Sequence, residues 1–116
     1  MIVNAADWLE SVQNPDGGWG ETPDSYADRR LLARGVSTPS QTAWALIGLI
    51  CAGRADSNSV RRGAEYLLET QREDGNWDES EWTGTGFPRV LYLRYWQYRL
   101  NFPLLALGKL RRALAA

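Results

Sequence analysis

The sequence of 116 residues contains no histidine and a single cysteine, Cys51. The absence of histidine excludes catalytic triads that use histidine and zinc sites built from His and Cys, so we predict no metal and no cofactor. One cysteine cannot form an internal disulfide, which is typical of a reducing compartment. Because Cys51 lies in the apolar run 43–52, we expect it to be a small core side chain.

A large net charge and a long apolar run are also missing, since the formal net charge is −1. Lys and Arg number 13 against 14 Asp and Glu, so charge does not indicate nucleic-acid binding. No signal peptide is visible, and the longest apolar run is about half of what a membrane-spanning helix needs. From residue 89 onward the chain has six basic and no acidic residues: Arg89, Arg94, Arg99, Lys109, Arg111 and Arg112. We interpret them as favourable charge near a helix C-terminus, with contact to anionic lipid headgroups as the alternative.

A six-point pattern occurs twice, 58 positions apart. The first copy is Trp8-Leu9-x-x-x-Gln13-x-x-Asp16-Gly17-Gly18-Trp19-x-Glu21, and the second is Tyr66-Leu67-x-x-x-Gln71-x-x-Asp74-Gly75-Asn76-Trp77-x-Glu79. A fixed period of this size is typical of stacked-repeat architectures. The apolar spacing before each glutamine predicts an amphipathic helix, and the Asp-Gly and Gly-Gly steps predict a turn.

We interpret the repeated residues as a structural staple. The glutamine amide can bond backbone groups at the helix end, and the tryptophan six residues later can fold back onto that end. The alternative is an aromatic that binds a sugar or a nucleotide, but catalytic sites are seldom repeated. The residues of the structural motif are Gln13, Gly18, Trp19, Gln71, Gly75 and Trp77.

Four helices are predicted, at about residues 3–13, 39–52, 59–71 and 100–114. The second has the clearest start, with Thr38 as N-cap, Pro39 at the first helical position and Gln41 closing a capping box. Two long connections, 14–37 and 72–98, separate the helices, and such loops are usually functional.

Function is expected in the second connection, which is rich in aromatic residues. It contains Thr83-Gly84-Thr85-Gly86-Phe87-Pro88 and then Leu91, Tyr95 and Tyr98 at helical spacing, with Tyr92 beside them. A helix there would present several rings to one cavity. The π-face of a ring stabilises a cation without acting as a base, which suits chemistry that runs through carbocations. The alternative is that the rings fill a helical core.

In these stretches the chain resembles the squalene–hopene and oxidosqualene cyclase family. The similarity rests on both Gln/Trp turns and on the segments 37–46, 83–88 and 102–108, and it covers essentially the whole chain. The resemblance implies an all-α fold, part of an (α/α) barrel with helical-hairpin repeats and long loops. Residues 1–116 would be the C-terminal fragment of a cyclase that converts squalene to hopanoids. The enzyme would be peripheral (monotopic) on the cytoplasmic side of a bacterial membrane.

The resemblance also assigns roles to the aromatic residues. Phe87 matches a phenylalanine that stabilises cations, Tyr95 and Tyr98 match active-site tyrosines, and Tyr92 falls beside them. Leu91 stands where the family's squalene cyclases carry a second phenylalanine, which puts the final ring closures in doubt. The family's Asp-x-Asp-Asp acid is absent. No residue of the chain is therefore expected to be the catalytic acid, and we expect the isolated chain to be inactive.

There are four alternatives to this interpretation. A close relative would cyclise another polyprene. A stand-alone α/α repeat module would bind a hydrophobic ligand or partner, and its uncovered apolar surface predicts self-association. A relative of protein prenyltransferase β-subunits is disfavoured by the lack of histidine, and a glycosidase that uses Asp16 and Glu21 is disfavoured because both residues recur in the second turn. In the full-length enzyme the expected partners are the polyprene, the rest of the chain and membrane lipid.

Overall fold

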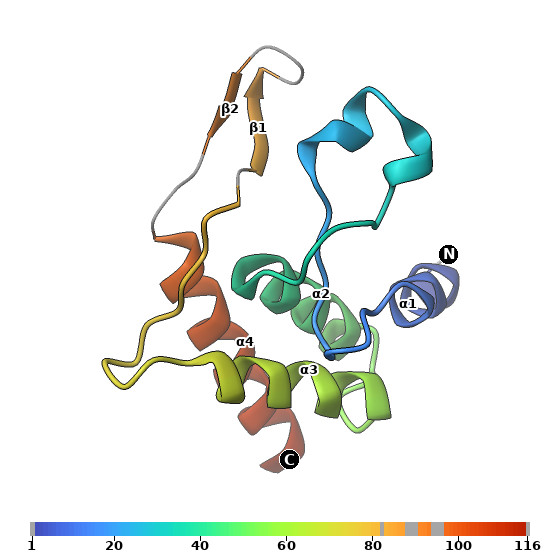
Figure 1. The fold of residues 1–116 in the computed structure, drawn as a ribbon. Coiled ribbons are helices and arrows are strands. Elements are labelled where there is room, and N and C mark those ends of the chain that lie inside the picture. The colour runs from blue at the N-terminus through green and yellow to red at the C-terminus, as the bar shows by residue number, and fades with distance from the viewer. Residues whose placement is uncertain (1, 82, 88–90, 94–96, 116) are drawn as a thin grey trace.

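The structure, a computed structural model, describes residues 2–81, 83–87, 91–93 and 97–115, with side chains for 3–81 and 97–115. In this part of the chain four α-helices form the body (Figure 1): α1 (Ile2–Ser11), α2 (Pro39–Cys51), α3 (Asn58–Thr70) and α4 (Tyr98–Ala115). The first long connection carries two short 3₁₀ helices, η1 (Pro23–Tyr26) and η2 (Arg29–Leu31). The second carries an antiparallel hairpin of β1 (Thr83–Phe87) and β2 (Leu91–Leu93).

The helices begin and end within about two residues of the predicted positions. Thr38 caps α2 by accepting a hydrogen bond from the Gln41 backbone N–H at 3.2 Å, and Gly53 follows the helix with a φ of 82°. In the same way Ser57 caps α3 by accepting from the Val60 N–H at 3.2 Å. A side-chain oxygen at this position satisfies a helical N–H that has no partner in its own helix. Local capping therefore sets both helix starts.

The core lies around α2, which occupies the middle of the molecule and contacts the other three helices (Figure 1). Leu46 and Leu49 of α2 are fully buried, as is Leu67 of α3. Trp77, which follows α3, is the largest fully buried side chain in the described part. The core cluster thus combines leucines of α2 and α3 with Trp77 of the second Gln/Trp turn.

Two expectations from the sequence are wrong. Cys51 is exposed rather than buried, because it is the last residue of α2 and lies off the face that packs in the core. The predicted helix through Leu91 is a strand instead, in which Phe87 pairs with Leu91 and Gly86 with Tyr92. Residues 91–93 form β2, and pairing with β1 holds them extended, a conformation that suits an aromatic residue such as Tyr92. The predominantly helical class is otherwise as predicted.

Candidate functional site: two Gln/Trp turns and an aromatic cluster

The two Gln/Trp turns have the same internal hydrogen bonds. Gln13 Nε2 donates to the Gly17 carbonyl at 2.8 Å, and Gln71 Nε2 donates to the Gly75 carbonyl at 2.9 Å. The φ angles of Gly17 and Gly75 are 93° and 85°, backbone conformations that residues other than glycine rarely adopt. The repeated Asp-Gly step is therefore needed to reverse the chain after each helix.

Each tryptophan is tied to the helix that precedes its turn. Trp19 Nε1 donates to the Leu9 carbonyl at 2.8 Å, and Trp77 Nε1 donates to the Leu67 carbonyl at 2.8 Å. Both rings are nearly inaccessible to solvent, with exposures of 5% and 0%. Each indole thus joins the helix end, the turn and the core, which is the arrangement of a staple.

The first turn is also docked on α3. Gln13 Nε2 donates a second hydrogen bond to the Ser59 carbonyl at 2.9 Å, and Arg62 Nη2 donates to the Pro15 carbonyl at 2.8 Å. Gly63 allows the close approach, since a Cβ there would lie 2.9 Å from Cζ3 of Trp19. The first copy of the repeat is therefore held by the helix of the second copy.

The glutamates of the two turns are hydrogen-bond acceptors for backbone groups. Glu79 accepts from the Ser40 N–H at 2.8 Å and from Ser40 Oγ at 2.9 Å, so its carboxylate caps the N-terminus of α2. A negative charge is favoured there by the helix dipole. Glu21 accepts from the Ala33 N–H at 2.7 Å and from Ser25 Oγ. Both carboxylates are engaged in structural contacts.

Three aromatic rings meet between α2 and α4. Trp44, Tyr98 and Phe102 lie edge to face, with ring centroids 5.3 to 5.5 Å apart. Tyr98 was predicted as a site residue, and Trp44 was not. The repeat itself carries the missing signal, because Trp44 stands 58 positions before Phe102. The cluster places Tyr98 at the start of α4, beside the hairpin connection.

Three other predicted site residues, Phe87, Leu91 and Tyr92, lie in the hairpin. The backbone pairs Phe87 directly with Leu91, and Tyr92 with Gly86, so three of the predicted residues lie on adjacent strands. Their side chains and the whole of Tyr95 lie outside the described residues. The structure thus brings the backbones of Phe87, Leu91 and Tyr92 together, in a hairpin rather than on a helix.

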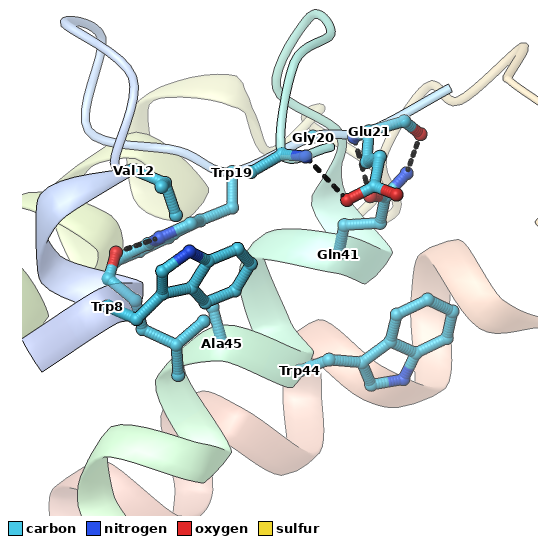
Figure 2. Close-up of a pocket in the computed structure, with 10 residues that line it drawn as sticks. Trp8, Val12, Trp19, Gly20, Glu21, Gln41, Trp44 and Ala45 are labelled. Atoms are coloured by element: carbon cyan, nitrogen blue, oxygen red, sulfur yellow. Dashed lines mark hydrogen bonds between the residues drawn. The ribbon is translucent and has the colours of Figure 1, made fainter. Parts of the chain in front are cut away.

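An apolar pocket of about 250 Å³ lies between α1, the first turn and α2 (Figure 2). Its walls include the rings of Trp8, Trp19 and Trp44. At its polar end the Gln41 side chain pairs with the backbone of Glu21: it accepts from the Glu21 N–H at 2.8 Å and donates to the Glu21 carbonyl at 3.1 Å. The pocket therefore combines indole surface with a carboxylate that is held in a fixed place.

Tyr66 of the second copy corresponds to Trp8 of the first, and the pKa of its phenol is raised. Its Oη donates to the Ser37 carbonyl at 3.0 Å. Burial raises the pKa of Tyr66 to about 12, and the nearby carboxylates of Asp16, Glu81 and Glu79 add to the shift. The hydroxyl is therefore neutral at physiological pH and acts as a hydrogen-bond donor.

The described part of the chain contains neither a candidate metal site nor a candidate membrane-spanning helix. No group of three or more His, Cys, Asp or Glu side chains there could hold a metal ion. None of the helices described is long and apolar enough to cross a membrane.

Each Gln/Trp turn follows one helix, α1 or α3, and is followed along the chain by a second, α2 or α4, which we call the inner helix of the copy. This order defines a helical repeat domain of the kind that builds (α/α) barrels. The family model described as the squalene-hopene cyclase C-terminal domain matches residues 1–112. The chain therefore belongs to the squalene–hopene cyclase family and corresponds to its C-terminal domain. This confirms the predicted all-α fold class.

Individual relatives agree with the family match. The chain is 56% identical to the squalene–hopene cyclase of Bradyrhizobium diazoefficiens over 96% of its length, which is 17% of that protein. It is 58% identical over 82% of its length to the squalene–hopene cyclase of Alicyclobacillus acidocaldarius, covering 15% of that protein. It is 49% identical to the dammaradiene synthase of Dryopteris crassirhizoma over 99% of its length, 19% of that protein. The chain thus spans less than a fifth of these curated relatives.

Proposed function

We propose that the chain is the C-terminal part of a class II triterpene cyclase that converts squalene to hopanoids through a carbocation cascade. Its contribution is one wall of the substrate cavity and a set of rings that stabilise cations. The observation that supports this most strongly is the family match over residues 1–112, together with the edge-to-face cluster of Trp44, Tyr98 and Phe102.

The proposed roles follow from the chemistry of the side chains. Phe87, Tyr92, Tyr95 and Tyr98 offer π-faces to the cations, and a π-face attracts positive charge without removing a proton. Leu91 keeps the cavity apolar but gives no such attraction. The chain has no Asp-x-Asp-Asp sequence, so the acid that starts the cascade comes from the rest of a longer chain.

We also propose peripheral attachment to the cytoplasmic face of a bacterial membrane, through contacts with lipid. In support, α4 exposes Leu104, Leu105 and Leu114 together with Lys109 and Arg111. Apolar and basic side chains on one helix suit an anionic lipid surface. Co-sedimentation of the chain with vesicles that contain anionic lipid tests this, and equal sedimentation with neutral vesicles contradicts the charge contribution.

A chimera tests the cyclase proposal. Residues 1–112 replace the matching C-terminal part of the Bradyrhizobium diazoefficiens enzyme, and squalene conversion is followed by gas chromatography with mass detection. The chimera is expected to form cyclic triterpenes, whereas the isolated 116-residue chain is expected to consume no squalene. Hopene formed by the isolated chain would contradict the need for an external acid. A folded chimera that consumes no squalene would contradict the proposed function.

Two variants of the chimera test the roles of the rings. Tyr98→Ala removes one ring of the cluster and is expected to lower conversion at least tenfold, while Tyr26→Ala in η1 serves as the control. Leu91→Phe restores a π-face and is expected to raise the share of pentacyclic product. A product pattern that does not change with Leu91→Phe would show that this position does not limit the late cations.

The second candidate function is a stand-alone module that binds a hydrophobic ligand. The apolar pocket beside Trp8 and Trp19 favours it, because its volume of about 250 Å³ would hold a small apolar molecule. Saturable quenching of tryptophan fluorescence by such a molecule in the isolated chain would support this function. Quenching that does not saturate would contradict it.

A further inference from the structure

The pocket between α1 and α2 has an equivalent in the second copy of the repeat, and there the first turn of a helix fills it. Tyr66 and Glu79 stand at the positions of Trp8 and Glu21. Tyr66 Oη donates to the Ser37 carbonyl just before α2, and the Glu79 carboxylate accepts from the Ser40 N–H within its first turn. These two residues of the second copy together hold the N-terminus of α2.

In the first copy the same two positions line an open pocket. Trp8 is 50% exposed, although it is a large aromatic residue at the position of the half-buried Tyr66. The Glu21 carboxylate is at the polar end of the pocket, and the Gln41 side chain fixes its backbone. The first copy thus has an aromatic and a carboxylate residue at the same two positions as the second, beside a space of about 250 Å³ (Figure 2), and its carboxylate also holds Ser25 and Ala33 of its own loop.

We propose that this pocket is the docking site for the N-terminal turn of an inner helix that belongs to the preceding repeat of the longer chain. The Glu21 carboxylate already accepts from the Ala33 N–H and from Ser25 Oγ, and its remaining lone pairs accept from backbone N–H groups of that turn, as Glu79 accepts from Ser40. The Trp8 indole covers the residue before the helix, in the place that Tyr66 takes beside Ser37. The inference rests on the proposed function in taking the chain as part of a longer cyclase.

The chemistry of the pocket selects this kind of partner. The first N–H groups of a helix lack acceptors within the helix and carry a partial positive charge, so a fixed carboxylate binds them well. The indole walls formed by Trp19 and Trp44 favour an apolar or small side chain in the same turn. A start such as Thr38-Pro39-Ser40, with a hydroxyl as a second donor, has the required groups.

A peptide with the sequence of residues 35–52 is a suitable probe, because it carries the helix start that the second copy binds. The peptide is labelled with fluorescein, has Ser in place of Cys51, and is titrated into the 116-residue chain while anisotropy is recorded. We expect saturable binding that Glu21→Gln and Trp8→Ala each weaken about tenfold. Asp24→Asn, which removes an exposed carboxylate from the same loop, is the matched control and is expected to leave binding unchanged.

Two results would overturn the proposal. One is the absence of saturable binding to a chain whose circular dichroism is helical. The other is binding that Glu79→Gln weakens and Glu21→Gln does not, because the peptide would then have displaced α2. Peptide binding does not depend on catalysis. An inactive chimera, together with peptide binding by the isolated 116-residue chain, therefore contradicts the cyclase proposal alone. An active chimera, together with no peptide binding by the isolated chain, contradicts this inference alone.

The chimera gives a second measurement that does not require the isolated chain. If a preceding helix covers Trp8, Trp8→Ala is expected to lower the Tm of the chimera by several degrees, as truncation of a buried tryptophan does. Tyr26→Ala is the control, because the exposed fraction of Tyr26, 45%, is close to the 50% of Trp8. A loss for Trp8→Ala no larger than the loss for Tyr26→Ala would overturn the proposal.

Discussion

The two copies of the repeat have the same turn but different neighbours. Within each copy the glutamine and the tryptophan bond the same backbone groups, at distances that agree within 0.1 Å. Outside the turn, the first copy is bound by Arg62 of α3, whereas Asn4 stands at the matching position of α1. The repeated residues therefore set the geometry of the unit, and the unrepeated residues set the contacts between units.

The direction of these contacts is also informative. The first turn contacts the helix of the following copy through Ser59, and the second turn contacts the inner helix of the preceding copy through Glu79. A chain of such units needs a neighbour on both sides to satisfy every turn, as expected for stacked repeats. Substitutions of residues that bond within a turn should therefore cost the same in both copies. Substitutions of residues that contact neighbouring helices should cost different amounts.

The largest effects are expected for the tryptophans, and they should be nearly equal. Trp77→Ala removes a fully buried ring and the hydrogen bond to the Leu67 carbonyl, so it should lower the free energy of unfolding by about 4 kcal/mol. Trp19→Ala should cost a similar amount, because the ring is 5% exposed and makes the matching bond. Urea denaturation measures both, and costs that differ by more than about 2 kcal/mol would show that the turns are not equivalent.

The next largest effect is expected at Gly20, which has no glycine counterpart in the second copy. A Cβ at Gly20 would lie 1.7 Å from the Val36 carbonyl oxygen, so Gly20→Ala must displace backbone and should cost about 3 kcal/mol. The matching residue is Asp78, whose side chain is 80% exposed and pairs with Arg72. Asp78→Ala should cost at most about 0.5 kcal/mol. Similar losses of unfolding free energy for the two variants would contradict the view that the backbone is closely packed at Gly20 and open at Asp78.

Much of the helical body could be predicted from the sequence. The Thr38-Pro39 start of α2 and the spacing of Gln13 and Trp19 are local signals, and a cap or a glycine turn acts through neighbouring residues. The repeat gave an internal control, since any feature found in one copy was expected in the other. Positions with local causes were therefore predicted within about two residues.

The errors arose where the deciding contacts are not local. Leu91 and Tyr92 have helical spacing with later tyrosines, but pairing with the strand before them sets their conformation. Trp44 was seen only as an apolar residue of α2, because its ring partners lie more than 50 positions away in α4. The pocket beside Trp8 could not be predicted either, since it depends on how α1 and α2 pack.

The glutamines should show a smaller difference between the copies. Gln13 Nε2 donates to two carbonyls, those of Gly17 and Ser59, whereas the hydrogen bond found for Gln71 Nε2 is to Gly75. At about 1 kcal/mol for each bond, Gln13→Ala should cost about 2 kcal/mol and Gln71→Ala about 1 kcal/mol. Equal costs would mean that the bond to Ser59 does not stabilise the chain, and docking of the first turn on α3 would then lack support.

A small effect is also expected at Tyr66, and its dependence on pH gives the test. Tyr66→Phe removes the hydrogen bond to Ser37 and should cost about 1 kcal/mol at pH 7. The pKa of Tyr66 rises from 10.0 to about 12 in the folded chain, so the unfolded chain loses this proton first. The contribution is complete below about pH 10 and falls as the pH rises towards 12.

The Tyr66→Phe chain should therefore lose less stability than the wild type between pH 10 and 12, measured as urea midpoints at several values of pH. Trp8 stands at the same position in the first copy and cannot ionise in this range, so Trp8→Phe should leave the slope unchanged. If the slopes of the wild type and Tyr66→Phe are parallel, the phenol is not buried, with Asp16 and Glu79 nearby, as the structure has it. The contact between the second copy and the start of α2 would then be weaker than its geometry indicates.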